Sequence, residues 1–361
     1  MKKTMLSVAI AAMSFGAIAD GGVGQNGVAL PSNTSFSEKG GVEVTLDNLI
    51  QAETAKYFSE EIALYGGNEF RHERAGIDLN NQTIIRSNFD AIYSYGVFDA
   101  SEGVTISMPD GELYQSVQVF DENHVTLGVA YPGEVMTIDA DQLTKGSHVY
   151  LFMRTQPKSF DDAGMAEVNV RQDKVKVTNS AKTDYVSPVQ YDVESFNKLR
   201  TDIIRRAPAE VVIHKGFITD LADIEYPHYH MANTAGWAGL PAQDAFYFVV
   251  MPGDENSRAA KCSTMTFDAP ELQYDRSAFW SLTAYDANGW VVTDTFRMNS
   301  TDATQNEDGS YTVSFNCGAN AINNIETSEN WNALFRNYLP VSLDSILDFQ
   351  KEVTSSLPIA Q

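Results

Sequence analysis

The stretch Ser-Ala-Phe-Trp-Ser-Leu-Thr-Ala-Tyr-Asp at residues 277–286, followed by Ala287-Asn288-Gly289, decides the fold class. Its residues change character with a period of two, which is the pattern of a β-strand. The strand separates an apolar face from a mixed face: Ala278, Trp280, Leu282 and Ala284 against Phe279, Ser281, Thr283 and Tyr285. Asn288-Gly289 is the strongest short signal for a hairpin. We expect an antiparallel pair with Trp290–Val292 as the returning strand.

Short β-type runs separated by turn residues recur in both halves of the chain. They lie at Thr83–Ile85, Val104–Met108, Tyr114–Phe120, Val125–Val129, Val149–Arg154, Lys174–Thr178, Ala245–Met251 and Tyr311–Asn316. Turns such as Pro109-Asp110-Gly111 and Glu307-Asp308-Gly309-Ser310 separate them. Many short strands with such turns favour a sandwich or barrel, so the sequence predicts a mainly β protein.

Helical spacing interrupts this pattern near the start and in the middle of the chain. Thr45 or Asp47 can cap a first helix, which Gly66-Gly67 ends. Asp192 can cap a second helix, which we expect to end before Pro208. The second helix is the natural boundary between two β domains.

These patterns divide the chain into five parts. They are a signal peptide at 1–19, a flexible leader at 20–43, a helix plus β domain at 44–190, a helical linker at 191–233 and a β domain with a closing helix, around Leu343–Val353, at 234–361.

The first 19 residues contain the three segments of a secretory signal peptide in the usual order. Lys2 and Lys3 form a positive start, Met5–Phe15 is a short apolar stretch, and Ala17-Ile18-Ala19 is a cleavage signal. No later window approaches the roughly 18–20 apolar residues of a membrane helix. We therefore expect an exported soluble protein, periplasmic or secreted, with no membrane insertion after cleavage.

Cys262 and Cys317 are the only cysteines of the chain. An even number of thiols in an exported protein predicts a disulfide, because the compartments outside the cytoplasm are oxidising. A reactive or metal-bound thiol is the alternative.

The chain is acidic, with 25 Lys and Arg against 48 Asp and Glu and a net charge of −23. It lacks a basic footprint, so we expect no nucleic-acid partner. The G-x-S-x-G, H-E-x-x-H and P-loop motifs are missing, as is a G-x-G-x-x-G followed by a helix, and we predict no cofactor. Catalysis by carboxylates leaves no short motif, so an enzymatic activity stays open.

The densest polar cluster lies at residues 86–94, Arg-Ser-Asn-Phe-Asp-Ala-Ile-Tyr-Ser. If residues 84–91 form a strand, Arg86, Asn88 and Asp90 share one face, about 7 Å apart in consecutive pairs. Inside a β-sandwich such a row can bind a polar ligand, with Tyr93 in contact. The alternative is a structural network in which Asp90 accepts hydrogen bonds from Arg86 or from the backbone.

Two further groups are candidates for binding. Arg297 and Arg336 each offer a cation in an acidic chain, although a single arginine is more often a salt-bridge partner. His228 and His230, with Glu225, could share a metal ion if they alternate on a strand. The alternative for the histidines is an exposed loop without metal.

Two strings resemble a known pair of bacterial domains. Arg86-x-Asn88-x-Asp90-x-x-Tyr93-Ser94 resembles the domain of unknown function 1254. Ala278-Phe279-Trp280-Ser281-Leu282-Thr283-x-Tyr285-Asp286, with Trp331 and Arg336-x-Tyr338-x-Pro340 further on, resembles the domain of unknown function 1214. The resemblance covers roughly residues 45–345. It implies two jelly-roll-like antiparallel β-sandwich domains with added helices, and no agreed activity.

Three kinds of function follow as expectations. Binding of a small polar or anionic ligand is favoured, because Arg, Asn, Asp and Tyr cluster at residues 86–93. A hydrolase that uses Asp90 as a base, or a metal at the histidine pair, is the second. A structural protein that forms homo-oligomers is the third.

Overall fold

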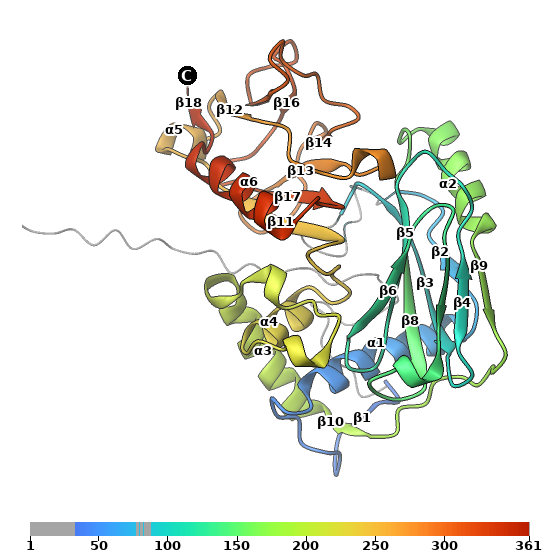
Figure 1. Cartoon of the computed structure of the whole chain (residues 1–361). Helices are drawn as coiled ribbons and strands as arrows, with labels where there is room; N and C mark the ends of the chain where they lie inside the picture. Colours follow the sequence, from blue (N-terminus) through green and yellow to red (C-terminus); the bar gives the residue numbers. More distant parts are fainter. Residues whose placement is uncertain (1–32, 77–78, 80–81, 83–87, 361) are drawn as a thin grey trace, which may run out of the picture.

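The computed structural model describes residues 33–76, 79, 82 and 88–360 and shows two β-rich lobes (Figure 1). In these residues the strand pairs are antiparallel, except β1 (Phe36–Ser37) with β10 (Tyr191–Asp192) and β15 (Tyr311–Phe315) with β16 (Asn324–Ile325). Six α-helices accompany the strands within the same ranges. The prediction of a mainly antiparallel β protein with added helices is confirmed. The signal peptide and the strand expected at Thr83–Ile85 lie outside the described residues.

The first lobe stacks two sheets around an apolar core. The larger sheet has the order β2 (Arg71–His72), β3 (Ile92–Asp99), β8 (His148–Thr155), β5 (Gln115–Phe120) and β6 (Thr126–Ala130). The smaller sheet has the order β7 (Val135–Ile138), β4 (Val104–Ser107) and β9 (Lys176–Asn179). Ile106 of the smaller sheet packs with Val117 and Leu151 of the larger one, so the core lies between the sheets. The helix α2 (Asp162–Lys174) follows β8 along the chain.

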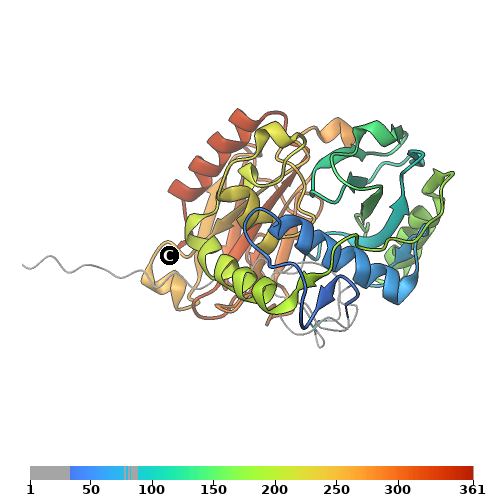
Figure 2. The same ribbon diagram turned by 90° about the horizontal axis from the view of Figure 1, so that it is seen from below.

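Helices cover the opposite face of the larger sheet. α1 (Leu49–Tyr65) packs on the sheet through Phe58, while α3 (Val193–Glu210) and α4 (His228–Ala235) pack beside it (Figure 2). Gly66 ends α1 as expected, and the Asp192 carboxylate caps α3 by accepting a hydrogen bond from the Ser195 N–H at 2.8 Å. The helical segment between the β domains therefore packs on the first lobe.

The expected end of α3 before Pro208 is wrong, because the helix continues to Glu210. Proline removes one backbone donor, but the following turn still closes through the Val211 N–H, which bonds to the Ala207 carbonyl at 2.9 Å. One lost hydrogen bond near a helix end does not prevent the last turn from forming.

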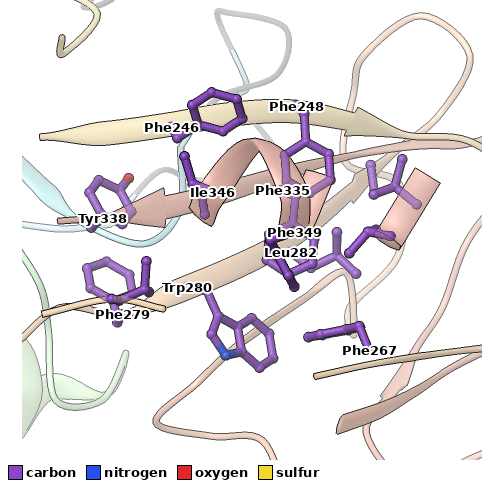
Figure 3. Close-up of a cluster of buried hydrophobic side chains, with 14 of the residues drawn as sticks. Phe246, Phe248, Phe267, Phe279, Trp280, Leu282, Phe335, Tyr338, Ile346 and Phe349 are labelled. Atoms are coloured by element: carbon purple, nitrogen blue, oxygen red, sulfur yellow. The ribbon is translucent and has the colours of Figure 1, made fainter. Parts of the chain in front are cut away.

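The second lobe also consists of two sheets. One has the order β11 (Ala245–Val250), β17 (Asn332–Tyr338), β13 (Trp280–Tyr285) and β14 (Arg297–Asn299). The other has the order β16, β15, β12 (Ser263–Phe267) and β18 (Ile359–Ala360), and the short helix α5 (Glu255–Arg258) precedes β12. The closing helix α6 (Leu343–Ser355) seals the core with Ile346 and Phe349 (Figure 3).

The strand that decides the fold class has the two faces predicted for it. Trp280, Leu282 and Ala284 are buried in the core, where Trp280 lies near Phe267 (Figure 3). Ser281, on the opposite face, lies across from Arg336 of the neighbouring strand. The polar face of this sheet is thus turned away from the second lobe's core.

The hairpin after β13 is only partly as expected. The turn forms, because Asp286 accepts hydrogen bonds from the N–H groups of Asn288 and Trp290 at 2.8 and 2.9 Å. Trp290–Val292 is not a strand, and the chain instead pairs with β13 at β14. The Val291 N–H donates to Gln82 Oε1 at 3.0 Å. Because this backbone donor is used by Gln82, it is not available for pairing with β13.

The predicted disulfide between Cys262 and Cys317 is present. It links Cys262, which directly precedes β12, to Cys317, the second residue after β15, and Ser263 lies opposite Phe315 on these two strands. In the described residues, no helix is long and apolar enough to cross a lipid bilayer.

Candidate functional site

The segment Asn88–Ala91 runs between the two lobes. The condition that residues 84–91 form a strand is not met by these four residues, because β3 begins only at Ile92. Asn88 Oδ1 accepts a hydrogen bond from the Asp90 N–H at 2.9 Å, and such a local side-chain bond competes with strand pairing. Phe89 packs on Phe296 of the second lobe. Arg86 lies outside the described residues.

This turn places the Asp90 carboxylate on the polar face of the second lobe's sheet. Asp90 is 1% exposed. Its Oδ2 accepts a hydrogen bond from the Ser281 hydroxyl and lies 3.7 Å from Arg336 Nη1. Its Oδ1 is buried and has no hydrogen-bond partner in the part of the chain that the structure describes. A carboxylate from the first lobe is therefore held by the second lobe through one of its two oxygens.

Arg336 on β17 is the cation of this pair and is 3% exposed. Its guanidinium donates to the Thr283 hydroxyl at 3.0 Å and to the Tyr285 hydroxyl at 2.9 Å. Burial alone would lower the pKa of Arg336, but the neighbouring Tyr285 and Asp90 raise the pKa above its usual value on balance. Arg336 therefore stays charged in the protein interior.

A second buried guanidinium, that of Arg154, approaches from the first lobe. Arg154 is 4% exposed and donates to Gln118 Oε1 at 3.1 Å and to the Ala238 carbonyl at 2.6 Å. Both acceptors are neutral. Among the described residues, no carboxylate lies within ion-pair distance of Arg154. The buried ion pairs of this part of the chain involve other cations, namely Arg200 and Arg336.

Each of the two arginines has a tyrosine as its cross-strand neighbour. Tyr93 lies opposite Arg154 on neighbouring strands, and Tyr247 lies opposite Arg336 in the same way. Burial raises the pKa of Tyr93 to about 12, although both arginines oppose the rise. Burial also raises the pKa of Tyr247, again against both arginines. Both phenols are thus protonated at neutral pH and can donate hydrogen bonds.

Asn88 connects the two lobes at this point, since its side-chain N–H donates to the Tyr338 hydroxyl at 2.9 Å. We call the assembled group the interdomain polar cluster. It consists of Asn88, Asp90, Tyr93, Arg154, Tyr247, Ser281, Tyr285, Arg336 and Tyr338.

The structure therefore places four of the candidate residues in one cluster: Asn88, Asp90, Tyr93 and Arg336. Arg297 starts on the same sheet, opposite Thr283, but its guanidinium lies 4.0 Å from the ring centre of Phe160 and 3.7 Å from Asp302. The charge of Arg297 therefore interacts with Phe160 and Asp302 and not with the cluster.

The histidine pair has a different geometry from the one expected. His228 and His230 lie on α4, where residues two apart point to nearly opposite sides, so the strand geometry is wrong. His228 Nδ1 accepts from the Val212 N–H at 3.2 Å, and Glu225 pairs with Lys215 at 2.8 Å. Within the described ranges, no three His, Cys, Asp or Glu side chains gather as metal ligands would.

Arg154 and Tyr247 are cluster residues that the sequence did not single out. Arg154 ends the predicted strand Val149–Arg154, and a lone charge at the end of an otherwise apolar buried strand is a usable signal. Tyr247 lies within an aromatic strand and gives no such signal, because an aromatic residue there is normal for a core.

Family models match both halves of the chain. Residues 67–179 match the model described as a protein of unknown function, DUF1254, and residues 243–342 match the model for DUF1214. The chain carries these two domains in the order expected. The cluster draws Asn88, Asp90, Tyr93 and Arg154 from the first and its other members from the second.

Two solved structures are similar to this chain to different degrees. The VPA0106 protein from Vibrio parahaemolyticus has a TM-score of 0.60 at 16% identity, covering 81% of this chain and 92% of its own. An uncharacterised protein from Burkholderia cenocepacia has a TM-score of 0.46 at 12% identity, covering 82% of this chain and 84% of its own. The first likeness shows a common fold. No curated protein matches the chain.

Proposed function

We propose that the protein binds a small anionic ligand in the interdomain polar cluster. The observation that carries this proposal is the charge imbalance around Tyr93 and Tyr247. Two buried guanidiniums, Arg154 and Arg336, act on these phenols, while Asp90 is the one carboxylate in ion-pair contact with either arginine among the described residues.

A buried cation without an anion is costly, because removal from water costs several kcal/mol per ion even after relaxation. Neutral acceptors such as Gln118 and the Ala238 carbonyl compensate for part of this cost. Asp244 is the next carboxylate: burial raises its pKa while Arg154 and Arg276 oppose the rise, but among the described residues it forms no ion pair with Arg154 and instead accepts from the Tyr131 hydroxyl at 2.7 Å. A bound anion would supply the missing charge beside Arg154.

The test is anion binding by the full chain, measured by calorimetry and by the thermal midpoint at constant ionic strength. The probes are acetate, gluconate, phosphate and sulfate, with chloride as the reference. We expect at least one probe to bind to the wild type and to lose about 100-fold in affinity in Arg154→Met.

Arg171→Met is the matched control, because Arg171 is also buried and also donates to backbone carbonyls but lies on α2, outside the cluster. Binding should survive in this control. Absence of binding for all four probes, or equal losses in both variants, would contradict the proposal.

A hydrolase that uses Asp90 as a base is the second candidate. Asp90 Oδ1, which has no hydrogen-bond partner within the described ranges, favours it, because a general base needs a free lone pair facing the substrate. In that case Asp90→Asn abolishes turnover of a substrate that the variant still binds. Under the binding proposal the same variant only weakens affinity.

Export is also part of the proposed function. The disulfide is compatible with an oxidising compartment. Cell fractionation and the intact mass of the purified protein test this: we expect a periplasmic or secreted form that begins at Asp20.

A further inference from the structure

The same three residue types occur side by side in both lobes. Tyr93 on β3 lies opposite Arg154 on β8, which in turn lies opposite Ser116 on β5. We call Tyr93–Arg154–Ser116 the first rung. Residues opposite one another on antiparallel strands point to the same face, so the three side chains lie together.

Tyr247 on β11 lies opposite Arg336 on β17, which lies opposite Ser281 on β13. We call Tyr247–Arg336–Ser281 the second rung. It repeats the order of the first: tyrosine on one neighbouring strand, arginine on the central strand and serine on the other neighbour.

The second rung shows what this arrangement holds. Its serine hydroxyl donates to Asp90 Oδ2, and its guanidinium lies 3.7 Å from the same oxygen. The group between serine and arginine is thus a carboxylate, delivered by the chain itself. The second rung is an internal carboxylate site that Asp90 fills.

The first rung has the same donors and no such carboxylate among the described residues. Ser116 is buried, and its oxygen accepts a hydrogen bond from the Tyr114 hydroxyl at 3.0 Å. Among the described residues no acceptor of the Ser116 proton is found, so this proton can be donated to a ligand, as that of Ser281 is donated to Asp90.

We propose that the first rung binds a carboxylate group of the ligand, in the way that the second rung binds Asp90. This inference rests on the proposed function and names the ligand class: a monocarboxylate. One guanidinium and two neutral hydroxyl donors match a single negative charge, whereas a phosphate dianion would leave one charge uncompensated in a buried site.

The first experiment compares anions at the first rung of the full chain. Acetate and gluconate should bind at least ten times more tightly than phosphate or sulfate at constant ionic strength. Ser116→Ala should cost about tenfold in carboxylate affinity, and Arg154→Met about 100-fold. Arg171→Met should leave the affinity unchanged.

The second experiment uses the second rung to test whether this arrangement of tyrosine, arginine and serine binds a carboxylate. It uses acetate and does not require the natural ligand. Asp90→Ala empties the second rung, and we expect acetate to raise the thermal midpoint of this variant more than that of the wild type. The gain should disappear in Asp90→Ala/Arg336→Met. If either variant fails to fold, Asp90→Asn, in which acetate should give no extra gain, takes its place as the comparison with the wild type.

The outcomes separate the two proposals. Binding of phosphate or sulfate without carboxylates, abolished by Arg154→Met, supports an anion site and overturns the monocarboxylate class. Carboxylate binding that survives Arg154→Met overturns the first rung as its location. No binding of any anion overturns the proposed function itself.

Discussion

Asp90 and Arg336 form an ion pair that joins the two lobes, and both side chains are almost fully buried. Arg336→Met leaves the Asp90 carboxylate buried without its cation. We expect a loss of about 3–5 kcal/mol in the free energy of unfolding, measured by urea denaturation, which is the usual result of removing one partner of a buried pair.

Asp90→Asn and the double variant complete a thermodynamic cycle for this pair. The double variant should be less destabilised than the sum of the two single variants, because neither ion then remains unpaired. Additive losses would show that the two residues act independently of each other.

Glu122 is a second buried carboxyl, at the turn between β5 and β6. Burial raises its pKa to about 7, while the backbone N–H groups of Ser147 and His148 limit the rise. The carboxyl lies against Gly146, where the left-handed φ of +70° and the contact with Glu122 leave no room for a Cβ atom.

The raised pKa makes stability depend on pH. The folded protein keeps the proton of Glu122 up to about pH 7, whereas the unfolded chain releases it near pH 4.5, so stability falls as pH rises through this window. Glu122→Gln should therefore be about 1–3 kcal/mol more stable than the wild type at pH 8, with a much smaller difference at pH 4. Urea denaturation at both pH values measures this, and Glu112→Gln, at an exposed position, should change neither value. A gain of equal size at both pH values would rule out titration as the cause.

At the scale of elements, α3 depends on its first turn. The Asp192 side chain satisfies the Ser195 N–H, one of the backbone donors that a helix start leaves without partners. Asp192→Ala should lower the free energy of unfolding by about 1 kcal/mol. Lys198→Ala, at an exposed position inside the same helix, should change it by less than about 0.5 kcal/mol. Equal effects of the two substitutions would exclude capping as the cause.

Elements of this kind were predictable because their signals are local. Asp192 and Gly66 mark the ends of their helices, and the period of two places Trp280 and Ser281 on opposite faces of β13. Each signal depends on residues only a few positions apart, so the sequence alone contains it.

The predictions that are wrong concern segments in which contacts with distant residues override the local preference for a strand. Trp290–Val292 has the composition of a strand but bonds to Gln82, and Asn88 forms a local turn in a segment that alternates like a strand. Arg154 could not be assigned to the cluster, because its neighbours Tyr93 and Ser116 are set by strand register. Register and lobe contacts join residues tens to hundreds of positions apart, and one sequence does not reveal such pairs.

At the scale of the whole molecule, the lobes share apolar and polar contacts. Tyr114 of the first lobe is part of the second lobe's core, with its ring centre 5.4 Å from that of Phe279. The Tyr131 hydroxyl donates to Asp244 at 2.7 Å, and Asp90 adds the buried ion pair described above. Contacts of this extent couple the lobes, so we expect them to unfold as one unit.

The disulfide tests this coupling, because it lies entirely in the second lobe. It closes a loop of 55 residues, and the chain-entropy model gives a loss of about 4 kcal/mol when Cys262→Ser and Cys317→Ser remove it. If the lobes unfold together, the slowest-exchanging amides of β8 and β17 should both exchange about a thousand-fold faster, since 1.4 kcal/mol corresponds to a factor of ten. Faster exchange confined to the second lobe would show that the lobes unfold separately, and the buried Asp90–Arg336 pair would then contribute to the site rather than to global cooperativity.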